Sequence, residues 1–277
     1  MDKDAFWNSK HGHIVSTKGG WRIGEAVYNH GYSMMDELIG NISYFQLMLL
    51  NVTGKIPEPR LAEWLESSYI CMSWPDSRIW CNQIGALAGN AGTKPSSACV
   101  AGVLASDSIL YGPGSLPACM KFISNAVKDQ KSGLSIKEII DKHANWNIVE
   151  DGSKKPQIPG YARPIAKGDE RVVAMKKESR KLGFPIAEHE KLSNDIANYL
   201  CKNYDENINI GGYTVAFLVD QNIKSTELYR FSVNRVSAGV QACYSEAADN
   251  PEGSFLPLKC DDITYTGVAP RTLPKRK

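Results

Sequence analysis

Residues 82–114 read NQIGALAGNAGTKPSSACVAGVLASDSILYGPG, and this stretch decides the fold class. Its apolar residues are mostly small and leave no continuous polar face, which is typical of helices buried within a molecule or at an oligomer interface. Two glycines around Pro113 then allow the backbone to approach a ligand closely, although they also suit a simple turn between helices. The stretch therefore predicts closely packed helices that end at a candidate ligand-binding turn.

Helical spacing continues on both sides of this stretch, whereas alternation with a period of two residues is scarce. A helix is predicted from Pro59, a second after the Ser135–Glu138 capping box, and a third over residues 186–202. Residues 145–168 are polar and rich in glycine and proline, and predict a long ordered loop, which in a compact domain is usually functional. The predicted apolar faces consist of Leu61, Trp64, Leu65; Ile136, Ile139, Ile140; and Leu192, Ile196, Ala197, Leu200.

The composition excludes several classes of protein. A chain of 277 residues with 43% hydrophobic residues can bury a full core. A net charge of +2 is too small for a nucleic-acid-binding surface, and the longest apolar stretches, such as residues 45–52, are too short to cross a membrane. We therefore expect a soluble cytoplasmic protein that binds neither nucleic acid nor membranes.

Cysteine and histidine spacing gives no metal-binding pattern. The seven cysteines contain no CxxC pair and mostly lie in apolar segments, so they predict reduced packing thiols rather than disulfides or ligands. The five histidines show no zinc-site spacing, and we expect no metal.

A series of short motifs follows in order along the chain. They are HGY at 30–32, DELIG at 36–40, GKIP at 54–57, CVAGVLA at 99–105, YGPG at 111–114, IPGYARP at 158–164, KGDER at 167–171, NIN at 207–209, VAFLVD at 215–220, NRV at 234–236 and YTG at 265–267. In this order and spacing they resemble the citrate synthase superfamily, nearest the citryl-CoA lyases and the citryl-cleaving module of ATP-citrate lyase.

This resemblance implies an all-α protein of two domains. Residues 1–113 plus 214–277 would form a large helical domain, and residues 114–213 a smaller one, with the active site in the cleft between them. The resemblance also implies an obligate homodimer with helices 83–110 in or near the interface, and coenzyme A as part of the substrate or product. An apolar helix in a chain of this size independently favours an oligomer.

The resemblance also points to three catalytic positions, where the family has two histidines and an aspartate. This chain has Tyr111, Arg163 and Asn209 there. Arg163 can clamp a carboxylate or polarise a carbonyl but cannot relay a proton, and Asn209 cannot act as a carboxylate base. Tyr111 is suited to donate a proton or a hydrogen bond, because an unperturbed phenol has a pKa of about 10. Ordinary citrate chemistry is therefore not expected.

The binding residues implied by the resemblance are retained. Arg171 and Arg235 match the arginines that hold substrate carboxylates, and an arginine fork binds a carboxylate bidentately. The turn at Gly160 and Tyr161 matches the backbone that surrounds coenzyme A, and Lys167 is placed to meet its phosphates. Asp169 is a candidate replacement base or substrate contact, although pairing with Arg171 is the interpretation we favour.

These residues leave three hypotheses open. The first is a divergent citrate synthase or citryl-CoA lyase-like enzyme that makes or cleaves a carbon–carbon bond in a non-citrate acyl-CoA by an altered mechanism. The second is hydrolysis of a CoA thioester or a 1,3-dicarbonyl compound, with Tyr111 and Arg163 stabilising the oxyanion. The third is a catalytically silent subunit that binds coenzyme A.

Overall fold

The computed structural model describes residues 3–12, 15–109, 111–149, 152–161, 168–254 and 259–274, and it is mostly helical. The expected fold class is therefore confirmed. The helices are α1 (Lys3–Lys10), α2 (Tyr44–Thr53), α3 (Pro59–Met72), α4 (Trp80–Asn90), α5 (Pro95–Ser106), α6 (Leu116–Lys131), α7 (Ile136–His143), α8 (Glu170–Lys181), α9 (Glu188–Tyr204), α10 (Ile210–Asp220), α11 (Ser225–Ser232) and α12 (Ser237–Ala248). The strands are β1 (Gly19–Arg22), β2 (Ala26–Asn29), β3 (Tyr32–Ser33), β4 (Asn145–Ile148) and β5 (Lys154–Gln157), and short helical turns cover Met34–Leu38, Gly112–Ser115 and Cys260–Asp262.

The three helices predicted from spacing and caps are confirmed. Helix α3 begins at Pro59 and buries Trp64 and Leu65, and α7 begins with the reciprocal capping box of Ser135 and Glu138. Helix α9 buries the predicted stripe of Leu192, Ile196, Ala197 and Leu200. Local caps and a period of 3.6 residues were therefore reliable guides to these elements.

Two short sheets were not expected, and the prediction of a loop over residues 145–168 is wrong where the hairpin of β4 and β5 occupies it. Lysines and asparagines occupy half of these positions, so the strands lack the apolar alternation that would have revealed them. The ring of Trp146 lies 5.8 Å from that of Tyr204, which fastens the hairpin to α9. The antiparallel sheet β1-β2-β3 near the N-terminus escaped notice for a similar reason, because β1 is exposed on both faces.

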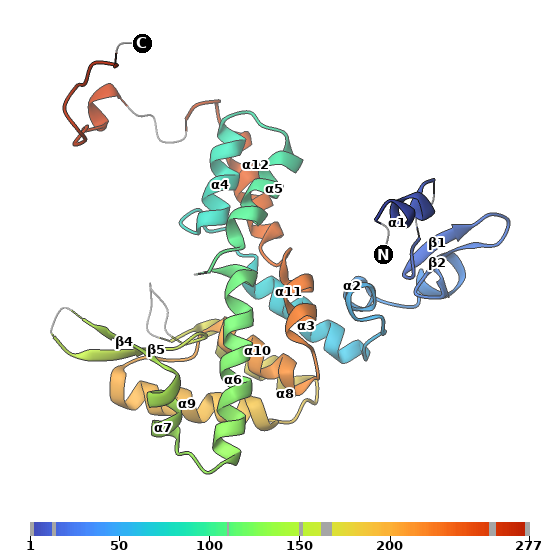
Figure 1. Ribbon diagram of the computed structural model, residues 1–277, viewed down its shortest axis with the longest axis horizontal. Coiled ribbons are helices and arrows are strands. Elements are labelled where there is room, and N and C mark those ends of the chain that lie inside the picture. The colour runs from blue at the N-terminus through green and yellow to red at the C-terminus, as the bar shows by residue number, and fades with distance from the viewer. Residues whose placement is uncertain are drawn as a thin grey trace.

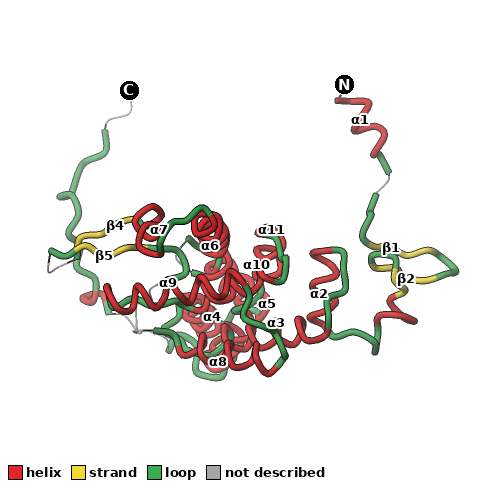
Figure 2. The backbone as a smooth tube through the Cα atoms, turned by 90° about the horizontal axis from the view of Figure 1, so that it is seen from below, coloured by secondary structure: helices red, strands yellow, loops and turns green. Residues whose placement is uncertain are grey.

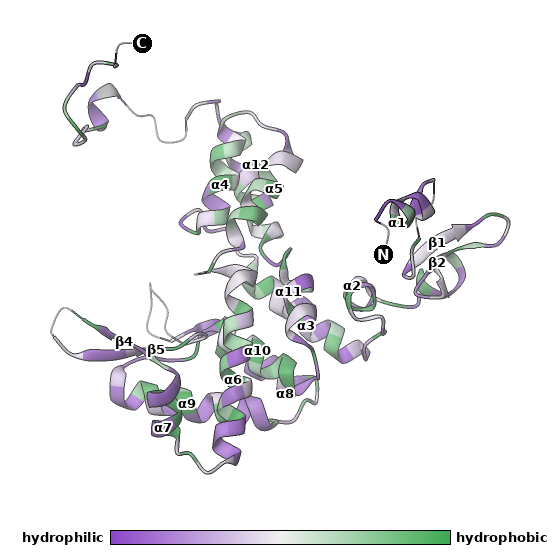
Figure 3. Cartoon of the chain, viewed as in Figure 1, coloured by the Kyte–Doolittle hydropathy of each residue, from purple (hydrophilic) through white to green (hydrophobic). Residues whose placement is uncertain are grey.

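Helix α6 runs through the main body of the molecule and packs against α7, α9, α10 and α11 (Figure 1). Helix α10 is buried along most of its length, and Figure 3 shows hydrophobic residues along both α10 and α5. At the centre of this core the Trp64 ring stacks on Phe217 with 4.0 Å between centroids, and its Nε1 donates to Ser179 Oγ at 2.7 Å. The division into a large and a small domain at residues 113/114 and 213/214 stays a prediction.

Helices α4, α5 and α12 form a separate bundle above this body (Figure 1). Glycines permit the close packing, since a Cβ atom at Gly85 would lie 2.8 Å from Val240 Cγ1 and a Cβ atom at Gly102 would also collide with Val240. The larger apolar side chains Leu87, Val100 and Leu104 point outward instead. The sequence therefore predicted correctly that small residues here serve close packing.

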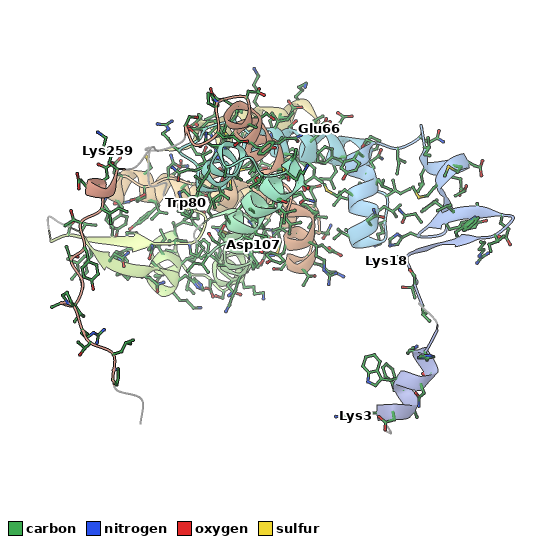
Figure 4. All side chains as sticks on the ribbon, turned by 90° about the horizontal axis from the view of Figure 1, so that it is seen from above. Lys3, Lys18, Glu66, Trp80, Asp107 and Lys259 are labelled. Atoms are coloured by element: carbon green, nitrogen blue, oxygen red, sulfur yellow. The ribbon has the colours of Figure 1, made fainter. Side chains whose placement is uncertain are left out.

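Both ends of the chain extend away from the body. The N-terminal part, with α1 and the β1-β2-β3 sheet, is joined through α2, and residues 261–274 near the C-terminus are exposed. Figures 2 and 4 show the two ends projecting from the same side of the molecule.

The structure also bears on the expectations about membrane spans and cysteines. Within the described ranges, no helix is both long and apolar enough to cross a bilayer. The six cysteines whose side chains are described are free thiols, and Cys81, Cys119 and Cys243 are buried, as expected for packing residues.

We predict that Gly212→Ala destabilises the fold because α10 packs against the turn at Gly160 without room for a side chain. A Cβ atom at Gly212 would collide with the Gly160 carbonyl oxygen, and one at Gly160 would lie 2.7 Å from the Gly212 Cα. Urea unfolding should show a loss of about 1–3 kcal/mol, the usual cost of overpacking. Gly20→Ala, where nothing lies within 4 Å, is the control and should leave the midpoint nearly unchanged. Equal midpoints for the two variants would contradict the packing argument.

Candidate substrate-binding site

A buried ion pair stands at the start of α8. The Asp169 carboxylate accepts hydrogen bonds from Arg171 Nε and Nη2, both at 2.8 Å, and its side chain is 0% exposed. Asp169 also accepts from the backbone N–H of Ile210 at 2.8 Å, which joins the first turn of α8 to that of α10. Both oxygens of the Asp169 carboxylate are therefore hydrogen-bonded, and Asp169 positions Arg171, the pairing that the sequence analysis favoured.

Arg171 extends from this pair toward the end of α3. Its Nη1 lies 3.6 Å from Met72 Sδ, and its guanidinium carbon lies 5.7 Å from the centre of the Trp74 ring. Burial lowers the pKa of Arg171, but pairing with Asp169 outweighs burial, so the pKa is raised overall. The side chain is 16% exposed and remains a cation.

Arg235, in the turn between α11 and α12, is a buried cation of a different kind. The residue is 6% exposed, its Nη2 donates to the Ser68 carbonyl at 3.4 Å, and its guanidinium lies 5.9 Å from the Tyr69 ring. In the part of the chain that the structure describes, it pairs with no carboxylate and its Nε has no hydrogen-bond partner. Burial lowers its pKa, yet an arginine stays charged in a protein.

Tyr111 lies beside these arginines. Its ring is 5.7 Å from that of Trp80, and the side chain packs against the small cluster around the buried Cys81. Burial raises the pKa of Tyr111 to about 12, while the charges of Arg171 and Arg235 act in the opposite direction. The phenol is therefore protonated at neutral pH, so it suits a hydrogen-bond donor and not a base.

The end of α3 forms the wall between the two arginines, and sequence reasoning missed it as part of the site. Cys71 lies within the electrostatic influence of both Arg171 and Arg235, and burial raises the pKa of its thiol. Trp74, three residues further on, has a buried indole Nε1 without a hydrogen-bond partner among the described residues. These residues carry no motif, and only the fold reveals that they face the arginines.

Asn209 stands at the other end of this cluster, where it begins α10. Its Oδ1 accepts from the Gly212 N–H at 3.0 Å as an N-cap, and its own N–H donates to the Gly160 carbonyl at 3.0 Å. Gly160 has φ of +89°, a conformation that favours glycine. The polar side chain of Asn209 therefore caps a helix next to the Gly160 turn.

The Tyr161 side chain faces the protein core. Its hydroxyl donates to the Ser193 carbonyl at 3.0 Å, and its ring packs edge-on against Phe122. Only the backbone of the Gly160–Tyr161 turn is therefore placed to meet a cofactor. The predicted site residues Arg163 and Lys167 lie outside the described residues.

The structure thus brings together Tyr111, Arg171 and Arg235, and links them through Asp169 to the start of α10 near Asn209. The cluster offers two guanidinium groups and a phenol, and the Asp169 carboxylate is already paired. Such an arrangement suits an anion.

Other features of the described chain do not add to this cluster. A cavity of about 390 Å³ lies near the N-terminal sheet and α2, lined by residues such as Lys18, His30 and Asn51, and is separate from the arginines. No group of three or more metal-ligating side chains occurs in the described ranges.

Known structures share the architecture. The chain matches citryl-CoA lyase from Hydrogenobacter thermophilus with a TM-score of 0.75 and 24% identity, over 94% of this chain and 97% of the other. It matches ATP citrate lyase from Methanothrix soehngenii, in complex with citrate and coenzyme A, with a TM-score of 0.72 and 16% identity, over 97% of this chain and 45% of that one. Citrate synthase from Thermoplasma acidophilum, in complex with carboxymethyl coenzyme A and oxaloacetate, matches with a TM-score of 0.59 and 14% identity, over 83% and 58% of the two chains.

These similarities show that the chain has the citrate synthase fold, as the motif order indicated. No protein-family model and no curated protein sequence matches the chain.

We predict that Asp169→Asn strongly destabilises the protein, because it leaves a largely buried Arg171 without its counter-charge. Breaking a buried pair on one side costs about 3–5 kcal/mol, which urea unfolding measures. Asp76→Asn is a matched control, since Asp76 pairs with Arg78 in the same i,i+2 arrangement on the surface. The control should change the unfolding midpoint little. Similar losses in both variants would show that burial of the Asp169 pair is unimportant.

Proposed function

We propose that this chain binds an acyl-CoA that carries a carboxylate and makes or cleaves a carbon–carbon bond in it, with a substrate other than citryl-CoA. The observation that carries the proposal is the Arg235 guanidinium, which is buried, has an unpartnered Nε and pairs with no carboxylate of the described chain. Tyr111 and Arg171 both influence the charge of Arg235, so the three side chains belong to one electrostatic cluster.

Burial of the Arg235 charge without a counter-ion is costly. An unpaired buried ion costs several kcal/mol, and a carboxylate in the site would offset that cost through charge-assisted hydrogen bonds. Arg235 Nε is inaccessible to solvent in this structure, so the residues around it have to move before a ligand can reach it. We expect a bound anion to stabilise the arrangement in which Arg235 is buried again.

The coenzyme A part of the proposal rests on the turn at Gly160 and on the likeness to proteins that were crystallised with coenzyme A or its derivatives. Gly160 presents backbone at the N-terminus of α10, beside Asn209. Lys167, seven residues further along the chain, supplies a cation for the phosphates.

The altered residues restrict the chemistry. Cleavage next to a thioester leaves the electron pair of the broken bond as an enolate, which the protonated Tyr111 and the guanidinium of Arg163 are suited to stabilise. The proton released from the other fragment needs a base, and Asn209 cannot accept it. The proposed reaction therefore takes its base from the substrate or from a group other than Asn209.

Two alternatives remain as separate proposals. Hydrolysis of a CoA thioester or a 1,3-dicarbonyl compound is favoured by the number of hydrogen-bond donors around Tyr111. A silent subunit that binds coenzyme A is favoured by the missing base at Asn209.

Product analysis by mass spectrometry distinguishes the three possibilities. Carbon–carbon cleavage yields a shorter acyl-CoA and a carbonyl compound, hydrolysis of a thioester yields free coenzyme A and the intact acid, and a silent subunit yields neither. Suitable substrates are carboxylated 3-hydroxyacyl-CoAs such as malyl-CoA for carbon–carbon cleavage and succinyl-CoA for hydrolysis, together with citryl-CoA, which we expect to remain uncleaved.

We also propose that the chain forms a homodimer through the outer face of α4 and α5. Leu87, Val100 and Leu104 are exposed there although they are apolar, and Leu104 is 70% exposed. Exposure of such a face to water is unfavourable, and covering it with a second copy of the chain lowers the free energy.

A cytoplasmic location is proposed from the thiols. All six cysteines whose side chains the structure describes are free, which fits a compartment that keeps thiols reduced.

We predict that Arg235→Met removes binding while preserving the fold. The variant replaces an unpaired buried cation by an apolar side chain, so the unliganded melting temperature should be equal or higher. The rise in melting temperature that carboxylated acyl-CoAs produce in the wild type should disappear. Arg78→Met, at an exposed arginine, is the control and should keep that rise. A wild-type rise in Arg235→Met would contradict the proposed site.

We predict that Leu104→Asp dissociates the dimer, because it places a charge in the apolar contact. Sedimentation velocity at micromolar concentration should show a monomer, whereas the wild type sediments as a dimer. Val173→Asp changes an equally exposed apolar residue on α8, outside the proposed face, and should remain dimeric. A wild type that is monomeric would refute the interface.

A further inference from the structure

Two buried nitrogen donors lack an acceptor in the neighbourhood of the arginines. They are Arg235 Nε and Trp74 Nε1, and neither has a partner in the described portion of the chain. A buried N–H without a partner costs about 1–3 kcal/mol, so buried polar groups are rarely left in this state without a reason. The proposed function accounts for Arg235 but not for Trp74.

The two donors belong to segments that are fastened together. Ser73 Oγ donates to the Arg235 carbonyl at 2.9 Å, and Trp74 directly follows Ser73. The Trp74 carbonyl accepts from Asn82 Nδ2 at 2.9 Å, and it lies so close to α12 that a Cβ atom at Gly239 would be 2.8 Å away. The backbone of Trp74 is therefore held between α4 and α12, next to Arg235.

The indole ring itself faces a cation. The Arg171 guanidinium carbon lies 5.7 Å from its centre, within the range of a cation–π contact. Arg171 is held in turn by Asp169, whose carboxylate is fully covered. The indole face is therefore covered by the Arg171 guanidinium, whose hydrogen-bonded carboxylate partner is Asp169, while the backbone of Arg235 is fastened to the neighbouring Ser73.

We propose that Trp74 is a ligand-binding residue whose indole N–H donates a hydrogen bond to the same carboxylate that Arg235 binds. The inference rests on the proposed function, because it takes the anion at Arg235 as given. A neutral N–H in a fixed direction adds orientation to the charge of the guanidinium. The indole N–H can only donate a hydrogen bond. The position therefore favours an acceptor such as a carboxylate oxygen and rejects an ammonium or amide nitrogen.

The test uses Trp74→Phe, which keeps an aromatic ring against Arg171 and removes only the N–H and the fused ring. Calorimetric titration of the full chain with acetate, malonate, succinate and citrate, with and without saturating coenzyme A, gives the affinity for carboxylates. We expect the best of these ligands to bind about tenfold more weakly or worse in Trp74→Phe, the usual effect of losing a hydrogen bond to a charged group. The affinity for coenzyme A alone and the unliganded melting temperature should stay nearly unchanged.

Trp64→Phe is the matched control, because the Trp64 N–H is buried but already paired with Ser179. This variant should lower the melting temperature and leave the carboxylate affinity unchanged, the reverse of Trp74→Phe. Ligand-induced changes in tryptophan fluorescence should also be smaller in Trp74→Phe than in Trp64→Phe.

The outcomes separate the two proposals. Equal carboxylate affinity in the wild type and Trp74→Phe overturns the role of Trp74 and leaves the proposed function intact. No carboxylate binding by the wild type, with or without coenzyme A, overturns both. A large loss of stability in Trp74→Phe without ligand shows that the indole N–H has a structural partner and overturns the role of Trp74.

Discussion

The Asp169 carboxylate is the interaction on which the candidate site depends. It accepts from two side-chain nitrogens of Arg171 and from the first N–H of α10, and its side chain is not exposed to solvent. One side chain thereby fixes the start of α8, the start of α10 and the direction of a guanidinium. A carboxylate used in this way cannot also serve as a proton acceptor for a substrate, so the scaffold and the chemistry compete for the same group.

Arg235 shows the opposite condition. Arg171 has its counter-charge in the protein, whereas Arg235 is buried against Ser68 and Tyr69 with neutral partners only. The two cations lie close enough to affect each other's charge, so an anion between them would relieve both burial and repulsion. The site therefore carries a net positive charge, because, among the described residues, two guanidinium groups share one paired carboxylate, that of Asp169.

The sequence predicted the helices well where the signal was local. The Pro59 start, the Ser135 capping box and the apolar stripe of α9 each depend on neighbouring residues, so they can be recognised without the fold. The ordered motifs pointed to the citrate synthase fold, although none of them is specific alone. The hairpin at residues 145–157 could not be predicted, because its exposed polar strands depend on contact with Tyr204.

The site was only partly predictable. Arg171 and Arg235 are candidates because they lie in motifs, and the pairing of Asp169 with Arg171 favoured from the sequence is present in the structure. Cys71 and Trp74 were missed, since their proximity to the arginines results from packing between segments distant in the chain. The position of Asn209 was predicted, but its function as a helix cap requires the backbone of α10 to be known.

The bundle of α4, α5 and α12 has a consequence for synthesis of the chain on the ribosome. Its first two helices pack through glycines against Val240, which emerges on the order of 140 residues after Gly102. At typical elongation rates of 5–20 residues per second, roughly 7–30 s pass before that partner exists. During this interval two apolar helices have no α12 to cover them, so a nascent chain of this protein is a natural client for chaperones that bind exposed apolar segments.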